Sequence, residues 1–195
     1  MDEGGLNDCG AFSLPGCGSD RLGAMKTLLV GLVACLASLN AQTSKSAANP
    51  LQSLAFLQGT WDAKAQGTAG VAANGSYTFR LELGDHVLAR HSYSSDCKGP
   101  KDFDCGHSDL LYVYVESPGQ ALKAIYFDNE GHVIHYDVST PDPATALFLS
   151  DASLPGPHFE LVYSLRDSVM SGKFQMQVPG ATEWKSYLEW SGGRK

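Results

Sequence analysis

Tyrosine, histidine, tryptophan and methionine side chains recur at alternate positions among apolar residues, a spacing that could build a ligand-binding interior. Tyr126, for example, alternates with the same period as Leu122 and Ala124. Alternate side chains of a strand share one face, so the apolar neighbours place this tyrosine on the buried face. The same alternation assigns a set of side chains to the interior: His91, Tyr93, Tyr126, His132, Tyr136, Tyr163, Met176 and Trp190. Such an interior suits a small apolar or amphiphilic ligand with one polar end, because each buried polar atom needs a partner.

The polarity of that ligand depends on the strand register. On this assignment Phe79, Leu161 and Met176 supply apolar contacts, whereas Arg80 and Arg90 point outward. We therefore expect no strong selectivity for a carboxylate. A register shifted by one residue would bring both arginines inside and reverse the preference toward anionic lipids. The alternative to a ligand cavity is a core that the same side chains fill completely.

Metal binding and catalysis find less support in the sequence. His132 and His135 are three residues apart, and on a strand such residues point to opposite faces, so they cannot converge on one ion. No serine lies in a Gly-x-Ser-x-Gly motif, the pattern that presents a nucleophilic serine on a strand-to-helix turn. We therefore assign neither catalytic nor metal-binding residues.

An all-β fold is expected to position the interior side chains. Pro50 opens a short helix that Gly59 ends, in keeping with the preference for proline in the first helical turn. About ten strands with period-two patterning follow, near 60–67, 76–84, 86–95, 108–116, 121–128, 132–139, 144–150, 157–166, 169–178 and 184–191. No segment is long enough for a crossover helix, so the strands should be antiparallel. Consecutive hairpins favour a closed up-and-down barrel over residues 50–195.

The composition fits one globular domain. The chain has 195 residues, of which 43% are hydrophobic and 18% are charged, and these values exclude a fibrous or low-complexity protein. The net charge is -7, so no diffuse cationic surface exists to neutralise a phosphate backbone. Nucleic acid is therefore excluded as an expected partner.

The N-terminal region carries the pattern of an export signal. Met25-Lys26 precede an apolar run from Leu28 to Leu39, and Ala41 offers a small residue for cleavage. The run is shorter than the roughly 20 residues that cross a bilayer, so we expect no transmembrane segment. We divide the region into a disordered leader or mis-assigned start (1–24), a signal peptide (25–41) and a linker (42–49), and expect a periplasmic or extracellular protein. Lipidation of Cys35 is the alternative to cleavage after Ala41.

Two cysteines remain after that cleavage. Cys97 and Cys105 bracket a short polar loop, and a close pair in an exported chain predicts a disulfide. A bound metal is the rival interpretation, but two thiolates with only His107 nearby make a poor zinc site.

Two stretches carry a resemblance to a known group of proteins. Residues 54–61, Leu-Ala-Phe-Leu-Gln-Gly-Thr-Trp, resemble the opening of calycin barrels, which include lipocalins, fatty-acid-binding proteins and nitrobindins. Residues 126–136, Tyr-Phe-Asp-Asn-Glu-Gly-His-Val-Ile-His-Tyr, resemble an uncharacterised family of small exported lipocalin-like bacterial proteins. The resemblance covers most of residues 50–191.

The resemblance implies further roles. In calycins a tryptophan closes one end of the barrel beneath a basic residue of the last strand, which implies a structural cap of Trp61 and Lys185. Nitrobindins bind haem through a histidine near the C-terminus, and no histidine follows His158 here, so we expect no haem or other cofactor. The implied function is binding of a lipophilic molecule. The alternatives are an isomerase-like enzyme, since such barrels sometimes host isomerases, and an interaction barrel with a filled core.

Overall fold

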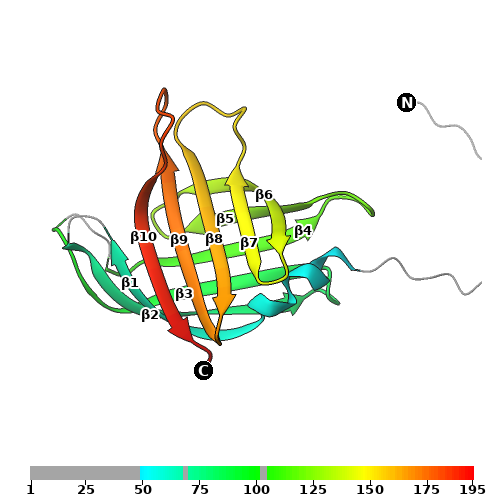
Figure 1. Cartoon of the computed structure of the whole chain (residues 1–195), viewed down its shortest axis with the longest axis horizontal. Coiled ribbons are helices and arrows are strands. Elements are labelled where there is room, and N and C mark those ends of the chain that lie inside the picture. The colour runs from blue at the N-terminus through cyan, green and yellow to red at the C-terminus, as the bar shows by residue number, and fades with distance from the viewer. Residues whose placement is uncertain (1–48, 68–69, 102–104) are drawn as a thin grey trace, which may run out of the picture. The chain divides into compact units, whose positions relative to one another are not determined.

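The chain forms a short helix followed by ten antiparallel strands. The computed structural model describes residues 49–67, 70–101 and 105–195. The predicted leader, signal peptide and all of the linker except Asn49 lie outside these residues. The elements are η1 (Pro50–Leu57), β1 (Gly59–Gly67), β2 (Ala72–Glu82), β3 (Val87–Lys98), β4 (Ser108–Val115), β5 (Leu122–Asp128), β6 (Val133–Asp142), β7 (Thr145–Ser150), β8 (His158–Arg166), β9 (Val169–Gln177) and β10 (Lys185–Gly193), shown in Figure 1.

The strands close into an up-and-down barrel. Each strand pairs with its neighbours in sequence, and β1 also pairs with β10, with Lys64 opposite Ser191. The predicted all-β, ten-stranded antiparallel barrel with a short N-terminal helix is confirmed. Among the described residues no helix is long and apolar enough to cross a membrane.

Helix η1 closes one end of the barrel. The side-chain oxygen of Asn49 accepts a hydrogen bond of 3.0 Å from the backbone N–H of Leu51, which caps the helix. Leu51, Leu54 and Leu57 face the barrel and are at most 2% exposed. Their leucine spacing of three residues suits the three residues per turn of a 3₁₀ helix.

Trp61 lies directly beneath this helix and forms the predicted cap, but the basic residue that covers its ring is not the predicted one. The indole Nε1 donates a hydrogen bond of 2.8 Å to the carbonyl oxygen of Leu57. The basic residue across the ring is Arg194, whose guanidinium carbon lies 4.4 Å from the ring centroid. Lys185 is exposed and pairs with Met176, so its assignment to the cap is wrong. Because β10 runs antiparallel to β1, the end of β10, not its start, lies beside Trp61.

Gly59 makes the approach of Arg194 possible. Its φ is +119°, and a Cβ atom there would lie 2.4 Å from Nη1 of Arg194. That nitrogen donates a hydrogen bond of 2.6 Å to the carbonyl oxygen of Gln58. A side chain at position 59 would therefore disturb both the backbone and the cap.

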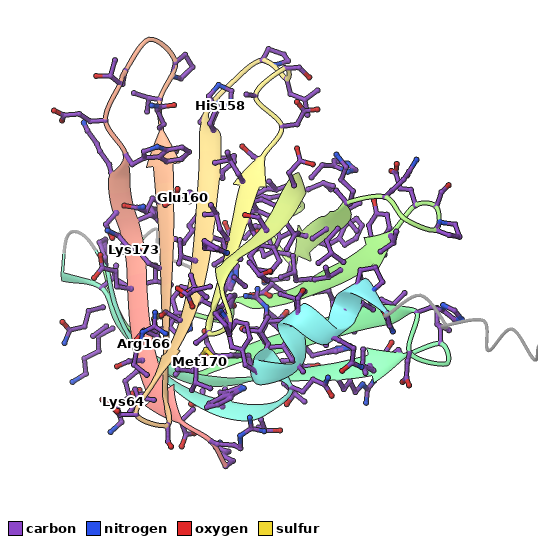
Figure 2. All side chains as sticks on the ribbon, turned by 45° about the vertical axis from the view of Figure 1, so that its right-hand side comes forward. Lys64, His158, Glu160, Arg166, Met170 and Lys173 are labelled. Carbon is purple, nitrogen blue, oxygen red and sulfur yellow. A yellow bond between two sulfur atoms is a disulfide. The ribbon has the colours of Figure 1, made fainter. Side chains whose placement is uncertain are left out.

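The apolar core fills the half of the barrel next to η1. Leu88, Leu111, Val113, Phe148 and Met170 are fully buried there. In Figure 2, Met170 at the lower end of β9 marks the end of the barrel that η1 closes, and His158 at the upper end of β8 marks the opposite end.

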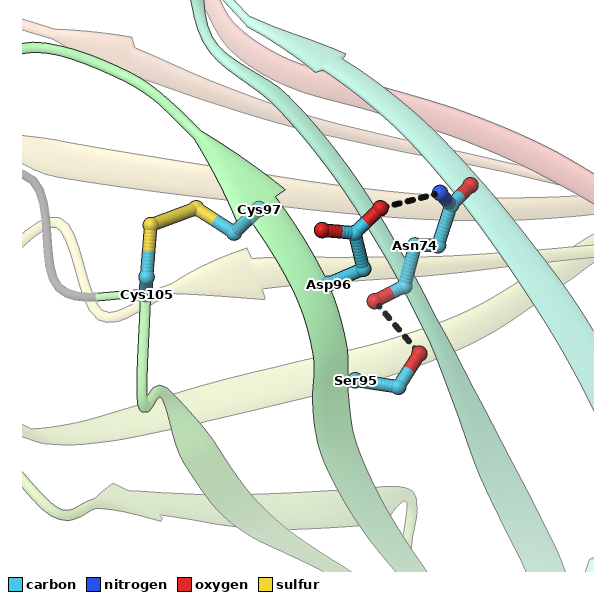
Figure 3. Close-up of a disulfide and its surroundings, with 5 residues drawn as sticks. All are labelled: Asn74, Ser95, Asp96, Cys97 and Cys105. Carbon is cyan, nitrogen blue, oxygen red and sulfur yellow. Dashed lines mark hydrogen bonds between the residues drawn. A yellow bond between two sulfur atoms is a disulfide. The ribbon is translucent and has the colours of Figure 1, made fainter.

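The predicted disulfide between Cys97 and Cys105 is confirmed. It joins the end of β3 to the segment before β4, with the two Cα atoms 5.3 Å apart (Figure 3). Next to it the hydroxyl of Ser95 donates a hydrogen bond of 3.2 Å to the backbone carbonyl of Asn74. The bridge therefore fixes the end of β3 to the segment before β4, and the hydrogen bond links the end of β3 to the start of β2.

Candidate functional site: an internal cavity

The end of the barrel opposite η1 contains a cavity of about 510 Å³. Its walls come from the end of β1, the start of β2, the end of β3 and the corresponding ends of β4, β5, β6, β8, β9 and β10. This volume lies within the range of about 300–1,000 Å³ that is typical of small-molecule sites. The interior of this half of the barrel is therefore not filled by side chains.

A buried ion pair lies at the inner end of the cavity. Nη2 of Arg90 donates a hydrogen bond to Oδ1 of Asp109, and Nη1 donates to the hydroxyl of Tyr163. Arg90 is 5% exposed and Asp109 is 8% exposed. The prediction that Arg90 points outward is wrong, whereas Arg80 is exposed as predicted.

The pairing of β3 explains why Arg90 points inward. It lies opposite Phe79 of β2 and Leu111 of β4, both of which are buried in the core. Residues directly opposite each other on paired strands project from the same face of the sheet. The guanidinium therefore has to lie among core side chains.

Both members of the pair are held in their charged forms. Burial is the largest single effect and alone would lower the pKa of Arg90 and raise that of Asp109. It is outweighed by several favourable interactions together: the partner's charge and hydrogen bond in both cases, and for Asp109 also the contact with His107. The pKa of Arg90 is raised and that of Asp109 is lowered as a result. An ion pair in a low-dielectric interior is costly to break from one side, because one charge is left buried and unpaired.

Tyr163 connects this pair to a cluster of aromatic rings. It is fully buried, and its ring centroid lies 5.3 Å from that of Phe79, 5.7 Å from Tyr77 and 5.6 Å from Trp190. Burial raises the pKa of Tyr163 to about 12, so the phenol stays protonated near neutral pH. Edge-to-face packing of such rings makes a rigid apolar wall.

Gly172 provides the space for one of these rings. It is paired with Tyr163 on one side and Trp190 on the other. A Cβ atom at position 172 would lie 2.0 Å from Cε2 of Trp190. The indole therefore lies across β9, where any larger residue would displace it.

A second polar group lies nearer the mouth of the cavity, around His107. Its Nε2 lies 3.4 Å from Oδ2 of Asp109 and 3.3 Å from the hydroxyl of Tyr126, and its Nδ1 lies 3.4 Å from Oε1 of Glu130. The hydrogen bond with Asp109 is the largest cause that raises the pKa of His107 above its ordinary value. His107 therefore connects the inner ion pair to the rim.

Asp128 organises the other side of the mouth. It accepts a hydrogen bond of 3.2 Å from the hydroxyl of Tyr126, and its Oδ2 lies 2.9 Å from Nδ1 of His132. Burial alone would raise the pKa of Asp128, but the bonds from His132 lower it. The carboxylate therefore stays ionised at the rim.

Some buried polar atoms around the cavity are poorly satisfied. Nε of Arg90 makes no hydrogen bond to another described residue, and the hydroxyl of Tyr77 and Nε1 of Trp190 have at most each other as partners. A buried donor without an acceptor is destabilising. These atoms mark where a bound molecule could supply the missing acceptor.

The cavity brings together all but one of the predicted interior residues. Its lining includes Tyr93, Tyr126, His132, Tyr136, Tyr163, Met176 and Trp190. Tyr93 is 58% exposed and lies at the mouth. His91 does not line the cavity; it pairs with Thr78, and its Nε2 lies 3.8 Å from Oε1 of Glu82. Its assignment to the interior is wrong, because neighbouring Arg90 occupies the inward face.

Asp109 and His107 were not among the site residues predicted from the sequence. Asp109 alternates with Leu111 and Val113 on one face of β4, and both of these residues are buried. An acidic residue on the apolar face of a strand was the available signal, since it requires a buried partner. His107 precedes the strand and has no such periodic signal.

Comparisons with known proteins find likeness in structure alone. No family model matches the chain, and no curated protein matches it in sequence. Among solved structures, the chain is similar to a Schistosoma mansoni fatty acid binding protein in complex with arachidonic acid, at 9% identity and a TM-score of 0.45, covering 73% of this chain and 98% of that one. It is also similar to a redesigned β-barrel, mFAP1, bound to DFHBI, at 11% identity and a TM-score of 0.37, covering 73% and 99%. At these identities the comparisons assign the chain to no family.

Proposed function

We propose that the protein is an exported carrier or sensor of a small, mainly apolar molecule, which binds in the cavity with its polar end toward Arg90 and Tyr163. The observation that carries the proposal is an open cavity of about 510 Å³ with a buried ion pair at its inner end. A structural barrel would gain stability by filling this space, since empty apolar volume is destabilising.

The cavity walls suit such a molecule. Leu161, Phe174 and Met176 supply apolar surface, and the aromatic cluster around Tyr163 forms the inner wall. The polar lining includes the Arg90–Asp109 pair at the inner end and Asp128 at the mouth, and His107 connects them. A ligand can therefore bury its apolar body against the apolar walls and direct a polar end toward these groups.

Two features, one of the sequence and one of the structure, support the proposal that the protein is exported. The sequence pattern of residues 25–41 is that of a signal peptide. The Cys97–Cys105 disulfide suits an oxidising compartment. Intact-mass analysis of secreted protein, before and after reduction, tests both: we expect a chain that begins at Gln42 and gains two thiols only on reduction. A secreted chain that retains Met1 or has free thiols would contradict this.

Ligand binding is tested by blocking the cavity. Ala63 lines the cavity, whereas Ala55 is exposed on η1. Native mass spectrometry of protein purified from its own host would identify a bound molecule. Thermal-shift measurements would then compare decanol, decanoic acid and haem. A compound that binds the folded state raises the midpoint of thermal unfolding. We expect Ala63→Phe to weaken binding by at least about tenfold and the matched Ala55→Phe to leave it unchanged. The proposal fails if none of the compounds binds, or if both variants bind equally well.

A further inference from the structure

We infer that the polar end of the ligand is an uncharged hydrogen-bond acceptor, such as the carbonyl of an ester, ketone or amide, and that the cavity discriminates against carboxylates. This inference rests on the proposed function. It concerns which head group the inner end accepts, and it follows from the charges and the unpaired donors around the cavity.

The charge of the cavity lining disfavours an anion. The ionisable side chains of the lining, other than tyrosines, are Arg90, Asp109, Asp128, Glu130, His107 and His132. One guanidinium therefore faces three carboxylates, and no lysine among the described residues lines the cavity. Even with both imidazoles protonated the positive charges only equal the negative ones, so a carboxylate finds no excess positive charge to bind.

Arg90 itself is already neutralised. Its Nη2 is bound to Asp109, and Nη1 is bound to Tyr163. Asp109 is also in contact with His107, which holds it in place. A carboxylate that reached the guanidinium would lie close to the Asp109 carboxylate, and two buried like charges repel strongly.

A neutral acceptor, in contrast, matches what the inner end lacks. Nε of Arg90 can only donate, and it has no acceptor among the described residues. Nε1 of Trp190 also can only donate, and its only partner among the described residues is the hydroxyl of Tyr77. A carbonyl oxygen has two lone pairs and carries no charge, so it can accept from these donors without disturbing the ion pair. An ammonium group can only donate, so it cannot pair with Nε of Arg90.

The test compares ligands that share one alkyl chain. Methyl decanoate, decanoic acid and decylamine are titrated into the full-length mature protein at about pH 8, where a carboxyl group is ionised. We expect the ester to bind at least about tenfold more tightly than the acid. Equal or tighter binding of the acid, or tightest binding of the amine, overturns this inference and leaves the proposed function intact. If no compound binds, the proposed function itself fails.

A charge-removing variant tests the cause of the selectivity. In Asp109→Asn the guanidinium loses its counter-charge, so decanoic acid should gain at least about tenfold in affinity while the ester changes by less than about threefold. Asp137→Asn is the matched control, because Asp137 pairs with Lys123 on the outside of the barrel, 2.5 Å away. An unchanged ester-to-acid ratio in folded Asp109→Asn overturns the inference. If this variant does not fold, the ratio measured for the unmodified protein still decides.

Discussion

The two ends of the barrel are built from the same strands, but one end is densely packed and the other contains a cavity. At the helix end, Leu54, Leu57 and Trp61 are at most 1% exposed, and the indole N–H is bonded to the backbone. At the open end, Arg90 and Asp109 are buried beside a cavity, and Nε of Arg90 has no hydrogen-bond partner among the described residues. The helix end provides stability, whereas the open end keeps a buried ion pair that is costly to desolvate. Stability and binding are therefore separable by position along each strand.

Removing the buried cation should have the largest effect. Arg90→Met leaves Asp109 buried without its counter-charge, and we expect a loss of about 3–5 kcal/mol in the free energy of unfolding. Urea denaturation measures it. In the double variant Arg90→Met/Asp109→Leu no charge is left unpaired, so most of the stability should return. A loss below about 1 kcal/mol in the single variant would show that the pair is not buried in solution.

A single methyl group added at position 172 should disturb the wall of the cavity. Gly172→Ala should cost about 1–3 kcal/mol, because the new Cβ would overlap the indole of Trp190. The matched control is Gly193→Ala, since a Cβ at position 193 meets nothing within 4 Å. Trp190 fluorescence and urea denaturation follow the two variants. Similar destabilisation by both would contradict the tight contact.

The helix end should respond to Arg194 and not to Lys185. Arg194→Ala removes the stacking on Trp61 and the hydrogen bond to Gln58, which should cost about 1 kcal/mol. Ligand affinity should not change, because the cap lies away from the cavity. Lys185→Ala should be neutral in the same denaturation assay. A larger effect of Lys185 would restore the originally predicted cap.

The smallest expected effect is a pH dependence at the mouth. The folded-state pKa of His107 is raised, so its contribution to stability is fully present below the unfolded pKa of about 6.5 and is lost as the pH rises through the folded value. The free energy of unfolding should therefore fall above about pH 6.5. His107→Gln should reduce this fall, as measured by urea denaturation across the range. An identical pH profile in the variant would exclude His107 as the cause.

The sequence predicted the fold well because period-two patterning is a local property. All ten strands, the short helix and Trp61 at its end follow from the spacing of apolar residues and turns. On β5 and β8 the pattern also placed Tyr126 and Tyr163 correctly in the interior. On β8 the inward positions Phe159, Leu161 and Tyr163 are apolar or aromatic, and the outward positions are polar except for Val162.

The same method failed on β3 for a physical reason. Val87, Leu88 and Ala89 are apolar in succession, and both Leu88 and Ala89 are fully buried, so burial does not alternate at the start of the strand. Arg90 is tolerated inside because Asp109 on another strand neutralises it. The sequence of β3 itself therefore carries no signal of this partner, and the signal lies on β4, where Asp109 occupies the apolar face.

The pairing of β1 with β10 also has a consequence for how the chain folds. Lys64 lies opposite Ser191, so the last hydrogen-bonded ladder joins segments from the two extremes of the barrel sequence. Contacts between distant segments form slowly, because the entropy of loop closure must be overcome before they contribute. Until this seam closes, β1 presents an unpaired edge that can hydrogen-bond to another chain. We expect seam closure to be the slow step of folding, and the open sheet that precedes it to be the species most prone to aggregate.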